Sequence, residues 1–125
     1  MFRLIGMTSN KNTGNKGEEM ASVYLSELGY TILEKNWRFK HWEVDIIASG
    51  KDNRLHFFEI KTRRSTKYGL PEESISKEKM MNLRNAAEQY QFIHPEWKYV
   101  QFDVLAILWL PDKAPEFLLF EDVYF

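Results

Sequence analysis

The sequence predicts an α/β protein with a mixed β-sheet flanked by helices. Two stretches, 16–28 and 76–92, carry apolar residues at helical spacing, and five others carry the alternating or continuous apolar residues that are typical of strands. The predicted order along the chain is therefore α-β-β-β-α-β-β. A chain of 125 residues, of which 44% are hydrophobic, is long enough to bury one core and too short for two ordinary domains.

The chain is expected to begin with an arm and a helix. Residues 1–14 are polar and end in turn-forming residues, so we expect a flexible N-terminal arm ahead of a single domain over residues 15–125. The first helix is predicted over 16–28, where apolar residues such as Leu25 recur on one side, and Gly29 ends it.

Two strands are predicted next, at 30–39 and 41–49. In the second, the even-numbered residues of 42–48 are expected on one face and the odd-numbered residues of 43–47 on the other.

A central strand is predicted at 54–62, after a turn at 50–53, because both of its faces are apolar. Glu59 and Lys61 are the charged exceptions, and they share one face. The remaining elements are a helix at 76–92, which ends before Pro95, and strands at 98–110 and 116–125.

The composition excludes several classes of protein. The absence of cysteine removes disulfides, thiolate metal sites and cysteine nucleophiles. A net charge of −1 argues against a general polyanion binder, and the longest apolar run, Val104–Leu110, is far shorter than the roughly 20 residues of a membrane helix. We therefore expect a soluble, cytoplasmic protein. The histidines lie at no metal-ligand spacing, and His56 is expected to be packed rather than catalytic.

Acidic residues gather on two consecutive predicted strands. Asp45 and Glu59 are equally far from the midpoint of the turn between the strands, so the simplest antiparallel register makes them neighbours. Two carboxylates in this position repel unless a cation lies between them, and Mg²⁺ or Mn²⁺ prefers such oxygen ligands. Lys61, on the same face as Glu59, is then placed to orient a water or to stabilise developing negative charge.

Two observations qualify this site. Glu18 lies at the N-terminal end of the apolar face of the first helix, where it either points toward the sheet or simply complements the helix dipole. The Glu59–Lys61 spacing by itself is weak evidence, because Glu96 and Lys98 repeat it in a loop-like context. The combination of a helix acid, two strand acids and the Glu-x-Lys pair is more specific.

That combination resembles the PD-(D/E)xK nuclease superfamily, which has a restriction-endonuclease-like fold. A closer resemblance, over roughly Asn15 to Ile107, is to the YraN family of small bacterial proteins, also called UPF0102. It is carried, in order and spacing, by GNKGEEMASVYLSELGYTILEKNWR, EVDIIA, FFEIKTR, SISKEKMMNLRNAAEQY and QFDVLAI. The resemblance implies an endonuclease-like fold related to archaeal Holliday-junction resolvases, and it suggests a homodimer.

The resemblance also implies roles for individual residues. Asp45 and Glu59 are expected to be metal ligands, and Lys61 the catalytic lysine. Glu18 matches the helix-borne acid of the family. The remaining correspondences are Glu43, the first acid of the GExD motif, and Lys79, a lysine at the start of the second helix that is expected to contact a phosphate.

The leading hypothesis is a Mg²⁺-dependent endonuclease that acts on DNA, including branched or structured DNA. Asp45, Glu59 and the backbone carbonyl of Ile60 are expected to hold the ion, and Lys61 to assist the attacking water. Phosphate contacts are expected from Arg63, Arg64, Lys67 and Lys79. The alternative for these basic residues is a solvated loop.

Two other classes of function stay open from the sequence. A non-catalytic nucleic-acid-binding protein would keep the nuclease fold, with Glu59 and Lys61 as a buried ion pair. A protein-interaction module would use Trp37, Phe39 and Trp42, which fit core packing equally well. Trp42 also stands where the family usually has glycine, so its ring either obstructs a duplex or stacks on an unpaired base.

Overall fold

The helices and strands follow the predicted order. The computed structural model describes residues 10–64 and 76–123, with the backbone alone for residues 10–15. The elements are α1 (Asn10–Glu27), β1 (Thr31–Phe39), β2 (Trp42–Ser49), β3 (Leu55–Arg63), α2 (Lys77–Ile93), β4 (Val100–Leu108) and β5 (Glu116–Phe120). Each predicted helix and strand is therefore confirmed, although the last strand, predicted over 116–125, ends at Phe120, and residues 124–125 lie outside the described residues.

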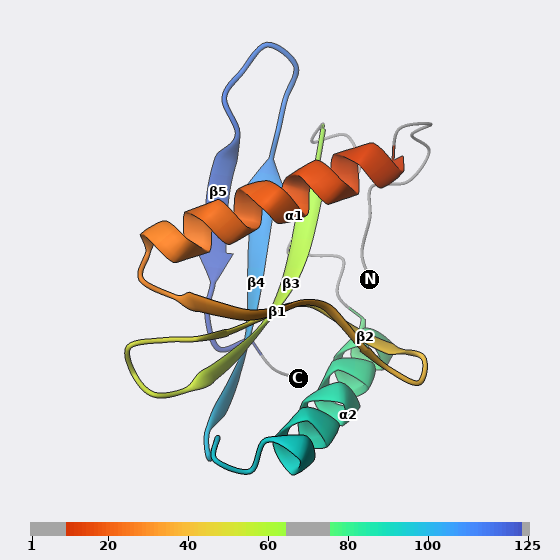
Figure 1. The fold of residues 1–125 in the computed structure, drawn as a ribbon. Helices are drawn as coiled ribbons and strands as arrows, with labels where there is room; N and C mark the ends of the chain where they lie inside the picture. Colours follow the sequence, from red (N-terminus) through yellow and green to blue (C-terminus); the bar gives the residue numbers. More distant parts are fainter. Residues whose placement is uncertain (1–9, 65–75, 124–125) are drawn as a thin grey trace.

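The strands form one five-stranded sheet in the order β1-β2-β3-β4-β5. Neighbours pair antiparallel except β3 and β4, which pair parallel. A parallel pair needs a crossover connection, and α2 lies in the segment between these two strands. In Figure 1, α1 crosses in front of β3, β4 and β5, whereas α2 lies beside β2. The prediction of a mixed sheet flanked by helices is confirmed.

Each helix covers a hydrophobic core on its own face of the sheet. On the α2 face, Leu83 and Tyr90 pack with Phe57 of β3, and on the α1 face Leu25 packs with Phe58. All residues of β3 are buried, because this central strand has a core on each side. The central strand is thus as predicted. Neither helix of the described ranges is long and apolar enough to cross a membrane.

The first helix begins earlier than predicted. α1 starts at Asn10, so residues 10–14, which we expected in the flexible arm, are helical, while residues 1–9 lie outside the described residues. Asparagine, threonine and glycine in this stretch have low helix propensity, which is why the sequence points to an arm. Extending a helix costs much less than nucleating one, and the buried turns around Ala21 and Leu25 supply the nucleus.

The alternation along β2 is uneven, contrary to the prediction. Val44 and Ile47 both pack on the α2 face, whereas Ile46 packs on the α1 face. The expected grouping of even-numbered residues on one face is therefore wrong. The alternation of side chains between the two faces shifts by one residue at Asp45. Lys35 and Trp37 of β1 pair with Ile46 and Val44, so Asn36 lies opposite Asp45. Asn36 has a φ of 52°. A left-handed residue turns the strand locally, and asparagine tolerates that conformation.

The middle of α1 approaches β3 closely at Gly17. A Cβ atom at that position would overlap Oγ1 of Thr62, a buried side chain of β3. Only glycine allows the helix and the strand to come this close. The contact holds the adjacent Glu18 beside the C-terminal end of β3.

Candidate active site

β2 and β3 part at the point where the predicted acidic residues lie. Their ladder ends at the pair Ile46 and Phe58, in the register that the sequence predicts. Beyond that pair the Asp45 carboxylate takes the place of the ladder, because its Oδ2 accepts a 2.8 Å hydrogen bond from the backbone N–H of Ile60. Asp45 is only 1% exposed. A buried carboxylate therefore spans the gap between the two strands.

The backbone of Ile60 offers an oxygen to the same gap. The N–H and C=O groups of one strand residue point to the same side of the strand. Because the Ile60 N–H points toward Asp45 of β2, the Ile60 carbonyl also faces the gap. The backbone geometry thus permits Asp45 and this carbonyl to share a ligand.

Glu59 lies on the α2 face of β3, in alternation with Phe57, and is 1% exposed. Oε2 of its carboxylate is 3.5 Å from Nζ of Lys79, whose side chain is 18% exposed. Lys79 is held in the first turn of α2, where its backbone N–H donates a 3.1 Å hydrogen bond to the hydroxyl of the N-cap residue Ser76. The lysine predicted to contact a phosphate therefore lies beside the second acid of the site.

The basic residues that follow Glu59 differ in their surroundings. Lys61 and Arg63 are buried in β3. Arg64 donates from Nε to the carbonyl of Trp109 at 2.9 Å, and its guanidinium carbon lies 4.7 Å from the centre of a ring of the same residue. Lys67 lies outside the described residues. Contacts within the chain thus hold the guanidinium of Arg64 in place.

Glu18 is buried and comes to the sheet from α1. Because α1 begins at Asn10 and has no acidic residue in its first turn, Glu18 is not placed to complement the positive end of the helix dipole. Its burial beside the end of β3 agrees with the other sequence-based alternative, a side chain that points toward the sheet.

Glu43 takes part in the β1–β2 hairpin. Its Oε2 lies 2.6 Å from Nη2 of Arg38, which is also its register partner on β1. Arg38 alternates with Trp37, which packs on the α2 face, so the ion pair lies on the opposite face from Trp37. This pair links the two strands of the hairpin beside the candidate site.

The donor set suits a hard cation that needs few protein ligands. Within residues 10–64 and 76–123, no group of three or more His, Cys, Asp or Glu side chains could together hold a metal ion. Mg²⁺ keeps several waters and typically takes one or two carboxylates. The carboxylates of the buried Asp45 and Glu59 and the Ile60 carbonyl are oxygen ligands of this type.

Sequence comparison identifies the family of this chain. The family model described as "Uncharacterised protein family UPF0102" matches residues 17–107. The chain belongs to the UPF0102 family. It is 42% identical to a UPF0102 protein of Syntrophomonas wolfei over 100 aligned residues. The aligned stretch covers 79% of this chain and 86% of that relative. A UPF0102 protein of Chloroherpeton thalassium is 38% identical over 121 residues, 95% of this chain and 93% of that protein.

This UPF0102 chain has a second polar cluster at the other end of β3. His56 is buried, as predicted for a packed histidine. Its Nδ1 lies 2.7 Å from Oδ2 of Asp103 on β4, and its Nε2 lies 3.2 Å from both carboxylate oxygens of Asp52 in the β2–β3 turn. Asp103 also accepts hydrogen bonds from Nε2 of Gln101 and from the backbone N–H of Asp122. The cluster joins the turn, two strands and the C-terminal segment.

Sequence reasoning did not single out Asp103. The available signal was the one that marked Glu59, a carboxylate inside a strand that is otherwise apolar, VQFDVLAIL. No local pattern indicates that Asp103 pairs with His56, because the two residues are 47 positions apart.

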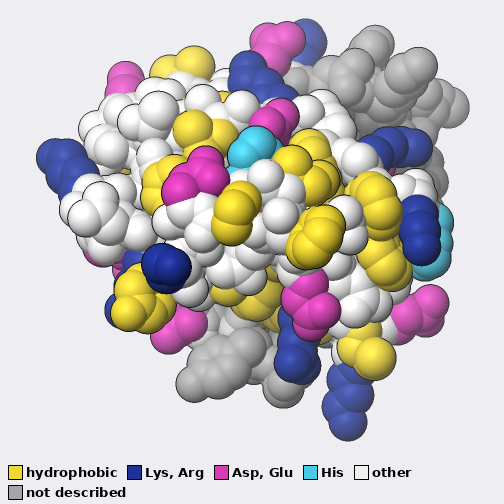
Figure 2. All heavy atoms as spheres, turned by 60° about the horizontal axis from the view of Figure 1, so that its bottom comes forward, with side chains coloured by type: hydrophobic (Ala, Val, Ile, Leu, Met, Phe, Trp, Pro, Cys, Tyr) yellow, Lys and Arg dark blue, Asp and Glu magenta, His cyan; other side chains and the backbone are white. Residues whose placement is uncertain are grey.

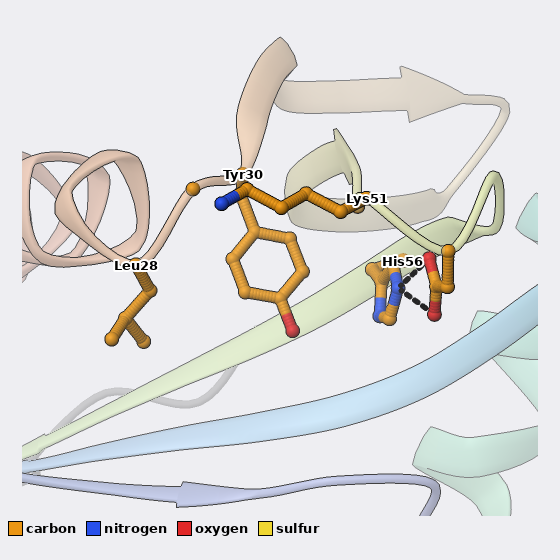
Figure 3. Close-up of a pocket in the computed structure, with 7 residues that line it drawn as sticks. Leu28, Tyr30, Lys51 and His56 are labelled. Atoms are coloured by element: carbon orange, nitrogen blue, oxygen red, sulfur yellow. Dashed lines mark hydrogen bonds and ion pairs between the residues drawn. The ribbon is translucent and has the colours of Figure 1, made fainter.

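An open pocket of about 250 Å³ lies beside His56. Figure 3 shows the Lys51 side chain extending toward Tyr30. His56 lies on the opposite side of the Tyr30 ring from Leu28, and dashed lines mark its contacts with Asp52. The ring of Tyr30 packs edge-on against His56, with 5.0 Å between the ring centres. Burial, together with the charge of Asp103, raises the pKa of Tyr30 to about 12. The pocket lies roughly 10 Å along β3 from Glu59, so it is distinct from the candidate active site.

His56 is expected to stabilise the fold most at low pH. Burial by itself lowers the pKa of His56, but the hydrogen bonds to Asp103 and Asp52 outweigh it and raise the pKa above the usual 6.5. A raised pKa contributes stability that is complete below the unfolded-state value and is lost as the pH rises through the folded-state value. His56→Gln should therefore lower the free energy of unfolding by about 1–3 kcal/mol at pH values below about 6, and by less above about 8.

Urea unfolding of both proteins at the two pH values measures this difference. His41→Gln, at an exposed position between β1 and β2, is the matched control and should change stability little at either pH. An equal loss of stability for His56→Gln at both pH values would contradict a raised pKa for His56 in the folded state.

Proposed function

We propose that this protein is a metal-dependent endonuclease that hydrolyses phosphodiester bonds in DNA. The observation that carries the proposal is the pair of buried carboxylates, Asp45 and Glu59, at the point where β2 and β3 part, with Lys61 next on the same face of β3. Burying such charges is energetically unfavourable, and departures of this kind from an apolar core are found mainly at functional sites.

Each group of the site has a role in this proposal. Asp45, Glu59 and the Ile60 carbonyl hold Mg²⁺ or Mn²⁺. When bound, the ion supplies positive charge that acidifies a water and stabilises the charge that develops on the phosphate. Lys61 orients the attacking water and adds positive charge beside the phosphate. Lys79, which lies beside Glu59, contacts a phosphate oxygen and so positions the DNA strand.

The ion pair between Glu59 and Lys79 supports a second candidate function. An ammonium 3.5 Å from a buried carboxylate offsets its charge, so this acid does not depend on a metal ion for compensation. A nucleic-acid-binding protein that keeps the nuclease fold but does not cleave would have this arrangement.

The experiment that tests the proposal is cleavage of defined DNA by the purified protein. Linear duplex, flapped and four-way-junction DNA are incubated with Mg²⁺ or Mn²⁺, and a parallel set contains EDTA. We expect metal-dependent cleavage by the wild-type protein and a rate at least about 100-fold lower for Lys61→Ala, since Lys61 stabilises developing charge. Lys113→Ala, at an exposed position between β4 and β5, is the matched control and should keep the rate.

The outcomes separate the two candidate functions. Cleavage that survives both Lys61→Ala and Asp45→Ala at the wild-type rate would come from a contaminant and would overturn the catalytic proposal. Binding without cleavage, weakened by added salt as counterion release requires, would support the second candidate.

A further inference from the structure

A row of aromatic rings runs along the β1–β2 hairpin. The ring centres of Trp37 and Phe39 on β1 are 6.4 Å apart with 12° between their planes, and Phe39 lies 5.9 Å from Trp42 on β2. Trp37 packs edge-on against Tyr90 of α2, with ring centres 5.3 Å apart. All three rings are only half-buried, and both tryptophans pack against the core on the α2 face. The row is therefore anchored in the core and still partly accessible.

The exposed charges of the hairpin are positive. Lys35, Arg38 and Lys40 are exposed, and of these Arg38 is paired with Glu43 on the face opposite Trp37. The acids of the hairpin have partners: Glu34 accepts a 3.3 Å hydrogen bond from a tyrosine hydroxyl of α2, and Glu43 pairs with Arg38 at 2.6 Å. The whole chain has a net charge of −1, and in Figure 2 basic and acidic side chains are interspersed on the visible face. The exposed lysines of the hairpin, Lys35 and Lys40, are thus a local feature.

Lys40 brings charge and rings together. It lies in the tight turn between β1 and β2 with a φ of 57°, and its Nζ is 5.6 Å from the ring centre of Phe39 and 5.8 Å from that of Trp42. Single-stranded nucleic acid is bound by this combination, because bases stack on the rings while the phosphates lie near the cation. Protein interfaces, in contrast, are depleted in lysine. The hairpin tip therefore fits nucleic acid better than a protein partner.

The tip is near the candidate active site and on the same face of the sheet. Trp42 is three residues before Asp45, a path of roughly 10 Å along β2. Trp42 and Phe57 pack on the same core, and Glu59 follows on that face of β3. Figure 1 shows the tip of the β1–β2 hairpin on the same side of the molecule as the start of α2, which carries Lys79. About three stacked nucleotides would span this distance.

We propose that the hairpin tip, residues 37–42, binds unpaired bases of the DNA substrate. Phe39 and Trp42 present ring faces to the bases, and Lys40 contacts the adjacent phosphates. The inference rests on the proposed nuclease function and deepens it, because it names the substrate class: DNA with a single-stranded stretch beside the bond that is cut, as in a flap or a fork.

The test measures binding in the absence of cleavage. Fluorescein-labelled single-stranded, forked and blunt duplex oligonucleotides are titrated with protein in EDTA, and dissociation constants are obtained from anisotropy. Phe39→Leu keeps an apolar side chain but loses the ring, so binding of the single-stranded and forked DNA should weaken about tenfold and binding of the duplex much less. Lys40→Gln should reduce the slope of log affinity against log salt for the single strand by about 0.7.

Matched controls show whether the effects belong to the hairpin. Phe92→Leu removes a ring that is 80% exposed near the other end of α2, and Lys113→Gln removes an exposed charge beyond β4. Both should bind all three oligonucleotides like the wild-type protein. Thermal melting of each variant confirms that it is folded.

Equal weakening of all three oligonucleotides by Phe39→Leu, or no weakening, would overturn the inference. Absence of DNA binding by the wild-type protein would also overturn it and would point to a protein partner for the rings. If the hairpin effect appears but the wild-type protein cleaves nothing with Mg²⁺ or Mn²⁺, the nuclease proposal fails and the binding inference stands. If the wild-type protein cleaves and Phe39→Leu keeps its preference among substrates, the binding inference alone fails.

Discussion

Asp45→Asn is expected to lower the rate of metal-dependent DNA cleavage by more than about 100-fold, the loss that even a supporting neighbour of a metal ligand can cause. Asparagine removes the negative charge that attracts the cation. Its amide oxygen still accepts the hydrogen bond that Ile60 N–H now donates to Asp45 at 2.8 Å. The free energy of unfolding should therefore change by about 1 kcal/mol or less. Cleavage assays and urea unfolding on the same preparation measure the two effects.

Asp45→Ala separates the structural role of the carboxylate from its chemical role. Alanine provides no acceptor for the buried N–H of Ile60, so this variant should lose about 1–3 kcal/mol of stability in addition to its activity. Asp112→Asn is the control, because Asp112 is exposed with a φ of 61°, a conformation that asparagine adopts readily.

Metal binding supplies a readout that does not depend on activity. A ligand that binds only the folded state raises the melting temperature, so Mn²⁺ should stabilise the wild-type protein and the Asp112→Asn control more than Asp45→Asn. An Asp45→Asn protein that cleaves DNA at the wild-type rate would rule out the assigned role of this carboxylate.

Gly17→Ala is expected to lower the free energy of unfolding by about 1–3 kcal/mol. The direction is informative, because in an exposed helix position the same substitution stabilises by about 1 kcal/mol. Here the new Cβ atom would overlap Oγ1 of the buried Thr62, and α1 would have to move away from β3. Urea unfolding detects the loss, and Ser26→Ala at an exposed position of α1 should change stability little.

A second substitution checks the cause of this effect. Thr62→Ala removes the atoms that the new methyl group meets, so Gly17→Ala should cost less in the Thr62→Ala background than in the wild-type protein. Contacting residues typically show a coupling free energy of about 0.5–3 kcal/mol in such a cycle. A Gly17→Ala protein more stable than wild type would mean that the helix lies farther from the strand.

Local patterns were sufficient to predict the elements and the register of the central hairpin. A side-chain period of two along β3 and a short turn at 50–53 leave one simple pairing, and the structure has that register up to Ile46 and Phe58. The same symmetry predicts that Asp45 lies near Glu59. Patterns failed where a neighbouring strand intervenes: the phase change at Asp45 coincides with Asn36 of β1, whose φ of 52° no pattern in β2 encodes.

By itself, the sequence determined the order of helices and strands, the central position of β3, and the set of acids from which a metal site can be built. These follow from periodicity, which depends on which side chains each short segment buries. Only the tertiary structure decided which distant side chains meet. It brought Lys79 to Glu59 and Asp103 to His56, and it placed Trp42 on the face that carries Glu59. Such contacts depend on strand twist and on where each helix packs, and both are properties of the assembled sheet.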